Sequence, residues 1–486
     1  MGRTISYNGK SVNTQEKPAL EQLASQHTAS LNEILQKLGI SLLVTTYQAG
    51  KLIVVRSEGE KINTRFTDFK QPMGLARGKD KFALGAKGTI IQFRSVPNNA
   101  TKVQKDGFAH DGCYQHMSTH ITGDIDIHEM GYDKDDRLWF INTKFSCLCT
   151  REGDDSFTPK WRPPFISGYD NLDRCHLNGL GFENGVPRYV TSLGISDEPL
   201  GWRKNKAFGG MLMDISDNTM LLEGLSMPHS PRVYRGKLWF LESGRGSLSY
   251  YDFTTKKVTQ VAELPGFTRG IDFVGNLAFI GLSKVRESAT FGAIPLTQKD
   301  IERVCGVWAV DINSGKILGF IRFTAGVQEI FAVTALPQKF PEILPLDHQL
   351  VNTTYIIPQT ALEEYKPPEN PVELAAPHFE KGNDLYNEGK KELARQQYEK
   401  ALAIQKDHIP ARFNLGVTLH DLGYLNEAEK ELQTVINNES QYFEAYYMLG
   451  QVHDKRQDAV KAKEMYQKSL TINPAFRKAQ IALEAL

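Results

Sequence analysis

The sequence is poor in the features that mark disulfide scaffolds, membrane proteins and nucleic-acid-binding proteins. Among 486 residues there are five cysteines, an odd number without short-spaced pairs of the disulfide-scaffold kind, which indicates reduced thiols. No apolar run approaches the roughly 18 residues of a membrane span. Lysine plus arginine and aspartate plus glutamate both number 57, and this balance suggests no polyanionic partner. We therefore expect a cytoplasmic protein with neither nucleic acid nor membrane as a partner.

The N-terminal stretch, residues 1–40, lacks the apolar core of a signal peptide. Polar residues interrupt it, among them Gln15, Glu16 and Lys17. Apolar residues between Leu20 and Leu38 recur at helical spacing. We predict one amphipathic helix in an N-terminal extension.

The strongest pattern lies at residues 371–486, where residue types return every 34 positions. Glycine and alanine each recur three times at this step, at Gly382, Gly416 and Gly450 and at Ala394, Ala428 and Ala462. A small residue midway along each of two antiparallel helices lets their backbones approach closely. The period and these residues resemble the tetratricopeptide repeat (TPR). The resemblance implies an all-α array of three helix pairs, with a capping helix after Pro474.

Arrays of that family bind an extended peptide or a helix on the concave face formed by their first helices, and the resemblance implies the same here. Family members that grip a C-terminal carboxylate carry a basic residue where this chain has Phe379. We therefore expect an apolar, aromatic-lined groove without a carboxylate clamp. The predicted partner-binding residues on the first helices are Phe379, Asn383, Tyr386, Phe413, His420, Tyr447, Gln451 and Asp454.

Residues 41–336 have a different character, with short β-type runs separated by Gly, Asn or Asp turns. The run from Ser41 to Val55 contains two such segments around a glycine turn and predicts a hairpin. Leu138-Trp139-Phe140 and Leu238-Trp239-Phe240 lie 100 residues apart, as 238 − 138 shows. About six loose units follow one another at roughly 50 residues, the length of a four-stranded blade.

These units predict a six-bladed β-propeller over residues 41–336, with an open stack of β-sandwiches as the alternative. Pairing of Ile330–Val333 with Leu42–Val44 would close the ring and leave no open edge. Prolines that recur between Pro337 and Pro371 then predict an extended linker, residues 337–370. The predicted fold class is thus multidomain, a mainly-β six-bladed propeller followed by an all-α TPR array.

Four phrases of the β region resemble a bacterial protein family in which such a propeller is joined to C-terminal TPR repeats. They are Gly123–Glu129, Leu138–Thr143, Cys175–Leu180 and Met227–Arg232. The resemblance implies this domain order and implies no activity.

In a propeller the innermost strands begin at one mouth of the central channel, so residues at the six openings converge there. Imidazoles and carboxylates in one funnel suit a divalent metal or acid–base chemistry. The candidate catalytic residues are His128, Glu129 and His229, and the candidate metal ligands are His128, Asn178, His229, Asp272 and Glu329. Propellers of the regucalcin and gluconolactonase group hold calcium or zinc at this mouth, but the likeness is one of architecture alone. The alternative is that these side chains bond to neighbouring blades and close the channel.

No phosphate-binding loop, nucleophile elbow or dinucleotide fingerprint occurs, which argues against nucleotide-driven chemistry. We therefore predict a protein-interaction scaffold that requires no cofactor. Its array would bind a peptide or helix of a partner, and its propeller would offer a second docking face. The alternative is a metal-assisted hydrolase or lyase at the propeller mouth, acting on a peptide or small molecule that the array delivers. A sugar- or lactone-binding propeller without turnover is a third possibility.

Overall fold

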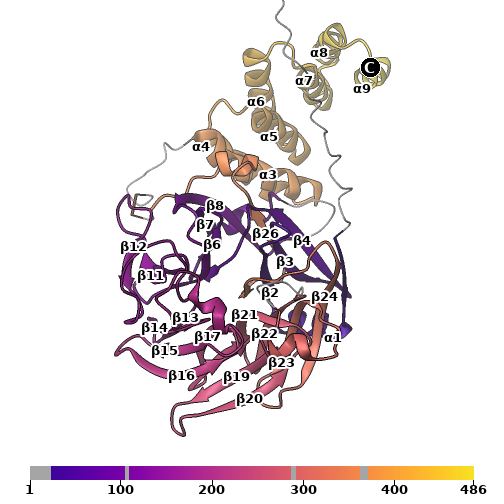
Figure 1. Cartoon of the computed structure of the whole chain (residues 1–486). Coiled ribbons are helices and arrows are strands. Elements are labelled where there is room, and N and C mark those ends of the chain that lie inside the picture. Colours follow the sequence, from indigo (N-terminus) through magenta and orange to yellow (C-terminus); the bar gives the residue numbers. More distant parts are fainter. Residues whose placement is uncertain (1–22, 104–108, 286–291, 359, 362–369) are drawn as a thin grey trace, which may run out of the picture. The chain divides into compact units, whose positions relative to one another are not determined.

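The computed structural model describes residues 23–103, 109–285, 292–358, 360–361 and 370–486. The chain divides into two compact units, Met1–Thr354 and Tyr355–Leu486. Strands dominate the described part of the first unit, and helices that of the second (Figure 1). The predicted succession of a β domain and a helical array is thus present.

Six sheets of four or five strands make up the first unit, and each is called a blade here. Blades 3, 4 and 5 are continuous in sequence. Blade 3 consists of β9 (Ile127–Tyr132), β10 (Leu138–Asn142), β11 (Cys147–Thr150) and β12 (Thr158–Trp161). Blade 4 consists of β13 (Leu177–Glu183), β14 (Val186–Ser192), β15 (Gly210–Asp214) and β16 (Thr219–Leu225). Blade 5 consists of β17 (Pro228–Tyr234), β18 (Lys237–Glu242), β19 (Ser247–Asp252) and β20 (Lys257–Glu263).

The other three blades contain strands from distant parts of the chain. Blade 1 consists of β25 (Val333–Leu336), β2 (Ser41–Thr46), β3 (Lys51–Glu58) and β4 (Lys61–Asp68). Blade 2 consists of β5 (Leu75–Arg77), β6 (Lys81–Ala86), β7 (Thr89–Ser95), β8 (Gly112–Ile121) and β26 (Pro341–Leu344). Blade 6 consists of β21 (Phe267–Val274), β22 (Leu277–Ser283), β23 (Cys305–Asp311), β24 (Ile317–Ala325) and β1 (Ala24–His27).

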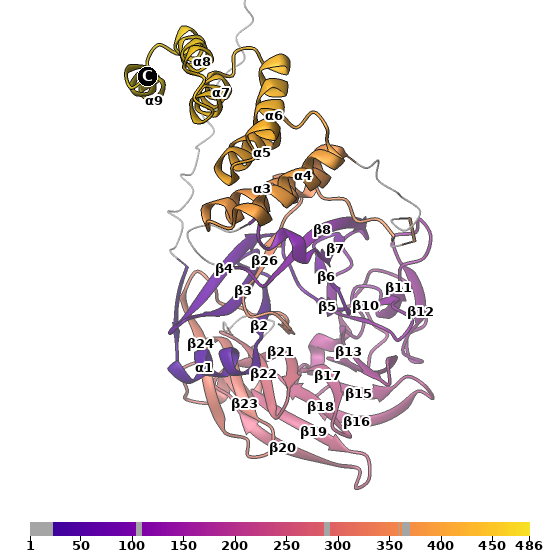
Figure 2. The same ribbon diagram turned by 180° about the vertical axis from the view of Figure 1, so that it is seen from behind.

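The innermost strands of the blades form a closed cycle. β25, β5, β9, β13, β17 and β21 contact one another in turn, and β21 contacts β25 again. Figures 1 and 2 show the blades following one another around a common centre. Apolar residues fill the space between neighbouring blades, since Leu52 and Val54 of blade 1 belong to one buried cluster with Phe82 and Phe93 of blade 2. The predicted six-bladed β-propeller is therefore confirmed.

The ring is closed at two places. β25 supplies the innermost strand of blade 1 and pairs antiparallel with β2, where Val333 lies opposite Val44. β1 adds an outermost strand to blade 6 by pairing with β24. The predicted pairing beside β2 is present, although the strand begins at Val333 and not at Ile330.

The N-terminal segment differs from the single predicted helix. Residues Ala24–His27 form strand β1, and helix α1 covers only Ala29–Leu38. Thr28 separates the two because its side chain accepts a hydrogen bond from Leu31 N and so caps the helix. Pairing with β24 outweighs the helical spacing of the apolar residues, and residues 20–22 lie outside the described part.

The predicted linker also contains regular structure. β26, Pro341–Leu344, pairs parallel with β8, and Ile343 and Leu344 are buried. A proline is compatible with this position because Pro341 begins an outermost strand. The linker prediction was thus wrong for this segment, and its residues 359 and 362–369 lie outside the described part.

Seven helices form the described array of the second unit. They are α3 (Pro371–Asn387), α4 (Lys391–Ile404), α5 (Ile409–Leu422), α6 (Leu425–Asn438), α7 (Phe443–Lys455), α8 (Ala459–Ile472) and α9 (Arg477–Glu484). The first six make three antiparallel pairs, and α9 packs on α8 as the predicted capping helix. A Cβ atom on Gly382, Gly416 or Gly450 would lie 2.3–2.7 Å from the side chain of Tyr398, Leu432 or Tyr466. The recurring glycines therefore allow the close helix approach that the sequence predicted.

Candidate functional site

Predicted site residues line one hollow at the propeller mouth and two on the helical array. The mouth cavity has a volume of about 320 Å³ and is lined by segments at the starts of several innermost strands. Its polar lining residues are Tyr47, Gln48, Asp126, His128, Asp173, His176, Arg203, His229, Arg269 and Glu329, and its apolar ones are Leu193, Trp202, Met227, Phe267 and Phe331. The predicted convergence of distant openings is therefore present.

His128 opens blade 3 and is held by the Nδ1 side of its ring. Nδ1 lies 3.0 Å from the carbonyl oxygen of Asp126 and 2.8 Å from Thr143 Oγ1. The Thr143 hydroxyl donates to the Leu177 carbonyl of blade 4 at 2.7 Å. Since both partners then act as acceptors toward the ring, Nδ1 carries the proton and Nε2 keeps its lone pair.

His229 opens blade 5 and repeats this arrangement. Its Nδ1 lies 3.0 Å from the carbonyl oxygen of Met227 and 2.9 Å from Ser243 Oγ, which donates to the Thr268 carbonyl of blade 6. Asp126 and Met227, each two residues before its histidine, both have positive φ, which turns the carbonyl onto the ring. Both blades thus fix the same tautomer and leave Nε2 as an acceptor.

His176 opens blade 4 and is held by a carboxylate. Its Nδ1 lies 2.9 Å from Asp173 Oδ2, and Trp202 Nε1 donates to the same oxygen at 3.0 Å. The His176 ring packs against Trp202 and lies edge-on to His128, with centroids 4.4 and 4.8 Å apart. His176 lies in the phrase Cys175–Leu180, but its carboxylate partner was not predicted because both residues adopt a left-handed backbone conformation that the sequence does not reveal.

Arg269 brings a positive charge into the cavity. Its Nη1 lies 3.3 Å from Glu329 Oε1, and its guanidinium carbon lies 3.4 Å above the Phe331 ring. Burial lowers the pKa of Arg269, and burial raises the pKa of Glu329 and of Asp126. The cavity therefore holds an ion pair in a poorly solvated place.

The two anchored histidines are neutral at physiological pH. Burial, and after it the positive charge of Arg269, holds the pKa of His128 and of His229 well below the usual 6.5. Each imidazole thus offers one lone pair to a ligand and no second proton.

Three candidate residues lie elsewhere. Asn178 accepts a hydrogen bond from Thr191 Oγ1 at 2.7 Å. Asp272 accepts from the Ala335 N–H of β25 at 2.8 Å and so helps to hold the closing strand. Glu129 pairs with Arg232. Since these side chains do not line the cavity, only His128, His229 and Glu329 of the candidate set remain there.

Metal binding at the mouth remains a prediction. Within the described ranges, no three His, Cys, Asp or Glu side chains are grouped so that they could hold a metal ion. The structure therefore brings candidate ligands into one cavity without forming a coordination cage.

Three of the four aromatic residues that were predicted to line the groove of the array pack between repeats. Their positions keep the step of 34: Phe379 packs on His408, Phe413 on Tyr442, and Tyr447 on Phe476, with centroids 4.8, 5.0 and 5.3 Å apart. Each contact joins a first helix to the start of the next pair. Phe379 and Phe413 are thus used for stacking the array, whereas Tyr386 and Tyr447 line hollows on it.

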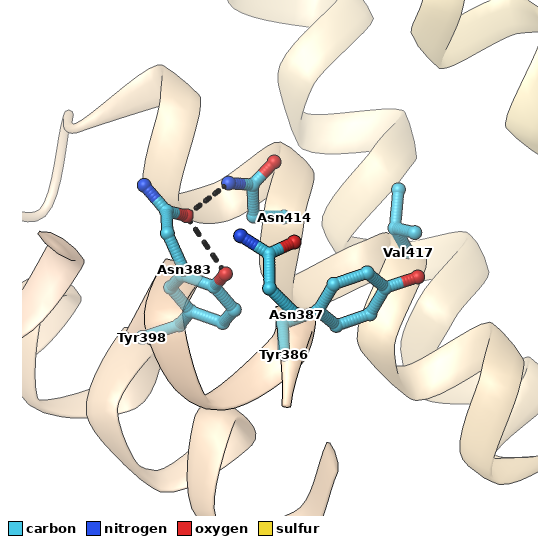
Figure 3. A pocket seen from close by; sticks show the side chains of 6 residues that line it. All are labelled: Asn383, Tyr386, Asn387, Tyr398, Asn414 and Val417. Carbon is cyan, nitrogen blue, oxygen red and sulfur yellow. Dashed lines mark hydrogen bonds between the residues drawn. The ribbon is translucent and has the colours of Figure 1, made fainter. Parts of the chain in front are cut away.

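The groove contains instead a hollow of about 320 Å³ that is rich in amides. It is lined by Asn383, Tyr386, Asn387, Tyr398, Asn414 and Val417. Asn383 Oδ1 accepts hydrogen bonds of 2.8 Å from the Tyr398 hydroxyl and from Asn414 Nδ2. Figure 3 shows Asn387 beside them without such a bond. Asn383 and Tyr386 are the predicted residues found here.

The amides are linked to the tyrosines of the second helices. The hydroxyl of Tyr398 donates to Asn383 in the first repeat, and that of Tyr466 accepts from Gln451 Nε2 at 2.7 Å in the third. In the middle repeat the same two positions are Leu432 and Val417, as the step of 34 shows. In both repeats that have a tyrosine at this position, its hydroxyl thus has an amide partner.

The other predicted groove residues lie farther along the array. Tyr447, Gln451 and Asp454 line a second hollow, of about 360 Å³, which ends at Leu486. His420 lies 3.2 Å from its neighbour Asp421 through Nδ1, and the same aspartate accepts from the Tyr386 hydroxyl and from Lys391 Nζ, both at 2.8 Å. Partner binding by these residues remains a prediction.

Comparison with known families matches both units. A family profile described as "Domain of unknown function (DUF4915)" matches residues 29–344. A profile described as "Tetratricopeptide repeat" matches residues 409–442 and 443–476. The first match covers most of the chain, and the second covers the last two helix pairs, so the predicted TPR array is confirmed.

Individual proteins show more limited likeness. Protein O-mannosyl-transferase TMTC1 of Homo sapiens is 32% identical over 89 residues, which are 18% of this chain and 10% of that protein. The second TPR domain of human RPAP3, solved in complex with the HSP70 peptide SGPTIEEVD, is 22% identical; the match covers 24% of this chain and 97% of that one with a TM-score of 0.23. A chain of a nidogen/laminin complex is 11% identical; the match covers 62% of this chain and 100% of that one with a TM-score of 0.40.

In the part of the chain that the structure describes, no helix is both long and apolar enough to cross a membrane.

Proposed function

Since the chain belongs to the protein family described as "Domain of unknown function (DUF4915)" and continues into tetratricopeptide repeats, we propose that it is a protein-interaction scaffold. The array binds an extended segment of a partner protein in the amide-rich hollow between α3 and α5. The propeller offers a second docking face, which its closed ring keeps rigid.

The observation that carries this proposal is the unused hydrogen-bonding capacity of the hollow. The side chain of Asn387 and Asn414 Oδ1 make no hydrogen bond to any described residue, and both line the hollow. Amides both donate and accept, so they suit the alternating N–H and C=O groups of an extended peptide backbone.

The residues that line the hollow also predict that a free C-terminal carboxylate on the partner is not required for binding. None of the six residues that line the hollow is lysine or arginine. A free C-terminal carboxylate on the partner would therefore gain no ion pair there. We expect an internal segment, or a peptide with an amidated end, to bind as well as one with a free end.

The test selects peptides from a random displayed library on the full-length protein and measures their affinity in solution. Asn387→Ala removes one exposed amide from the hollow and is expected to weaken the selected peptides about fivefold, the effect of one hydrogen bond. Asn437→Ala makes the same change on the exposed surface of α6 and serves as the matched control. Peptides that bind wild type and Asn387→Ala equally, or a selection that enriches nothing, would contradict the proposal.

A further inference from the structure

The mouth cavity of the propeller contains acceptors that the fold does not use. His128, His176 and His229 each use Nδ1 to bind a protein oxygen, and none of the three Nε2 atoms makes a hydrogen bond to a described residue. His128 is 8% exposed and His229 is 4% exposed. These Nε2 atoms are lone-pair acceptors in the lining of the cavity, so a molecule bound there can donate to them.

The backbone at the mouth is also held in an uncommon conformation. Asp126, Asp173, His176 and Met227 all line the cavity and have φ between 47° and 57°. Such residues persist only where the surrounding structure fixes them, and they cluster at ligand sites. Here the left-handed residues aim the imidazoles.

The cavity lining offers both acceptors and donors. Besides the three Nε2 atoms, the Asp126 carboxylate makes no hydrogen bond to a described residue, and Glu329 uses one oxygen for Arg269. The donors are the remaining N–H groups of Arg269, the Arg203 guanidinium, the Gln48 amide and the Tyr47 hydroxyl. A fitting ligand therefore brings groups that both donate and accept, as hydroxyl groups do.

The cavity lining is nearly balanced in charge, since the two arginines Arg203 and Arg269 stand against the three carboxylates Asp126, Asp173 and Glu329, and this balance favours a neutral ligand over a multivalent ion. Arg269 is the largest electrostatic cause of the lowered pKa of both His128 and His229, after burial. At these imidazoles the positive charge of Arg269 opposes a cation, while the carboxylates of Asp126 and Asp173 oppose an anion. Hydroxyl groups can donate to Nε2 without adding charge, and they can also accept from Arg269.

The shape agrees with this chemistry. The volume of about 320 Å³ is at the small end of ligand pockets. Trp202, Phe267 and Phe331 add aromatic surface to the wall, against which the C–H groups of a ring can pack.

We propose that the propeller mouth binds a small, neutral, polyhydroxylated molecule about the size of a monosaccharide, whose hydroxyl groups donate to Nε2 of His128, His176 and His229. The site is independent of the peptide-binding hollow of the array. It requires no reaction, since no bond is made or broken.

The test measures binding of glucose, galactose, mannose, xylose and myo-inositol to the full-length protein by calorimetry and saturation-transfer NMR. At least one is expected to bind saturably. In the double variant His128→Asn/His229→Asn, the asparagine amide keeps a donor near the place of Nδ1 but has no atom at the place of Nε2. The affinity should fall at least about tenfold, as expected for two lost hydrogen bonds.

A matched change at His120→Asn, on β8 and away from the cavity, should leave binding unchanged. Asp126→Asn tests the site without replacing an imidazole, and asparagine tolerates the left-handed backbone at this position. This variant should weaken binding about threefold. Tryptophan fluorescence shows whether each variant is folded.

The proposal is overturned if no member of the panel binds at millimolar concentration, or if the double variant binds as tightly as wild type. Elemental analysis supplies the competing result. A stoichiometric divalent metal that is present in wild type and lost from the double variant, without polyol binding, would identify the site as a metal site.

Discussion

The propeller and the helical array are both built from repeats, but only one of them closes. In the ring, equivalent positions of different blades meet at one mouth, so His128, His176 and His229 line one cavity. In the array, equivalent positions are laid out along a row, so Asn383, Val417 and Gln451 are 34 residues apart in sequence and occupy successive pairs. Closure concentrates side chains on a small ligand, whereas an open row suits an extended one.

The two regions also differ in how their ends are treated. The ring uses β25 and β1 to pair strands of the first and last blades with distant segments. The array ends on α9, a short helix that covers α8. We therefore expect the ring to unfold as a unit, and each end of the array to open more locally.

The largest expected effect breaks the closure of the ring. Gly270 in β21 has a φ of +74°, and a Cβ atom there would lie 2.7 Å from the backbone of Ala332 and Val333. Gly270→Ala should lower the free energy of unfolding of the propeller by about 3 kcal/mol, from backbone strain plus the clash. All five tryptophans lie in the first unit, so urea denaturation followed by tryptophan fluorescence measures this change.

Gly123→Ala is the control for this experiment. Gly123 has a φ of +71° but no atom within 4 Å of an added Cβ. It should lose only the roughly 1–2 kcal/mol of backbone strain. Equal losses in the two variants would show that contact with the closing strand does not stabilise the ring.

A smaller effect is expected inside the array. Tyr466→Leu places in the third repeat the residue that the second repeat has at Leu432, and it should cost about 2 kcal/mol through lost packing and an unpaired Gln451. Adding Gln451→Val, which copies Val417, should restore part of this loss. Unfolding followed by circular dichroism at the helical band measures the stability of the single and the double variant. Strictly additive losses would argue against coupling of the two positions.

The sequence specified the periodic features of both regions well. The step of 34 gave the helix pairs and their glycines because each repeat contacts only its neighbours. Leu138-Trp139-Phe140 and Leu238-Trp239-Phe240 fall in equivalent strands β10 and β18. The strand that closes the ring beside β2 was predicted because a closed ring of blades leaves no open edge.

The sequence did not specify features that depend on tertiary contacts. β1 has helical spacing but pairs with β24, and β26 contains proline but pairs with β8. Asp272 has the chemistry of a metal ligand, yet it binds the backbone of β25. Phe379 was expected to face a partner, but it packs on His408. In each case a residue type allows two roles, and only the neighbours in space decide between them.

A still smaller effect is expected in the pH dependence of propeller stability, which distinguishes the buried imidazoles from the other groups of the ring. The pKa of His128 and of His229 is lowered in the folded protein. Below about pH 6.5 the unfolded chain therefore binds more protons than the folded one, and the stability of the propeller decreases as the pH decreases. The slope reaches at most about 1.4 kcal/mol per pH unit for each histidine. Denaturation at pH 7, 6 and 5.5 should show a shallower fall in His229→Gln than in wild type.

The carboxylates of this cavity act in the opposite direction. The raised pKa of Asp126 and of Glu329 lets the folded protein bind protons more readily than the unfolded chain, which stabilises it as pH falls toward their range. Wild type and the His229→Gln variant both retain these carboxylates together with Arg269 and His176. The difference between their slopes therefore isolates His229, and identical slopes would show that this imidazole is not held neutral.

The smallest expected effect is on thiol labelling, because we expect no reaction of the cysteines in the native protein. All five cysteines are buried in the propeller, and burial raises the pKa of Cys113 and of Cys175 to about 12. A thiol reagent at neutral pH should therefore label none of them in the native protein, because the thiolate is the reactive form. In partial denaturant a ring without free ends should expose all five together, so labelling and tryptophan fluorescence should change in parallel. Labelling of Cys113 alone, in the blade that β26 completes, would show that this blade opens by itself and that closure does not make the ring cooperative.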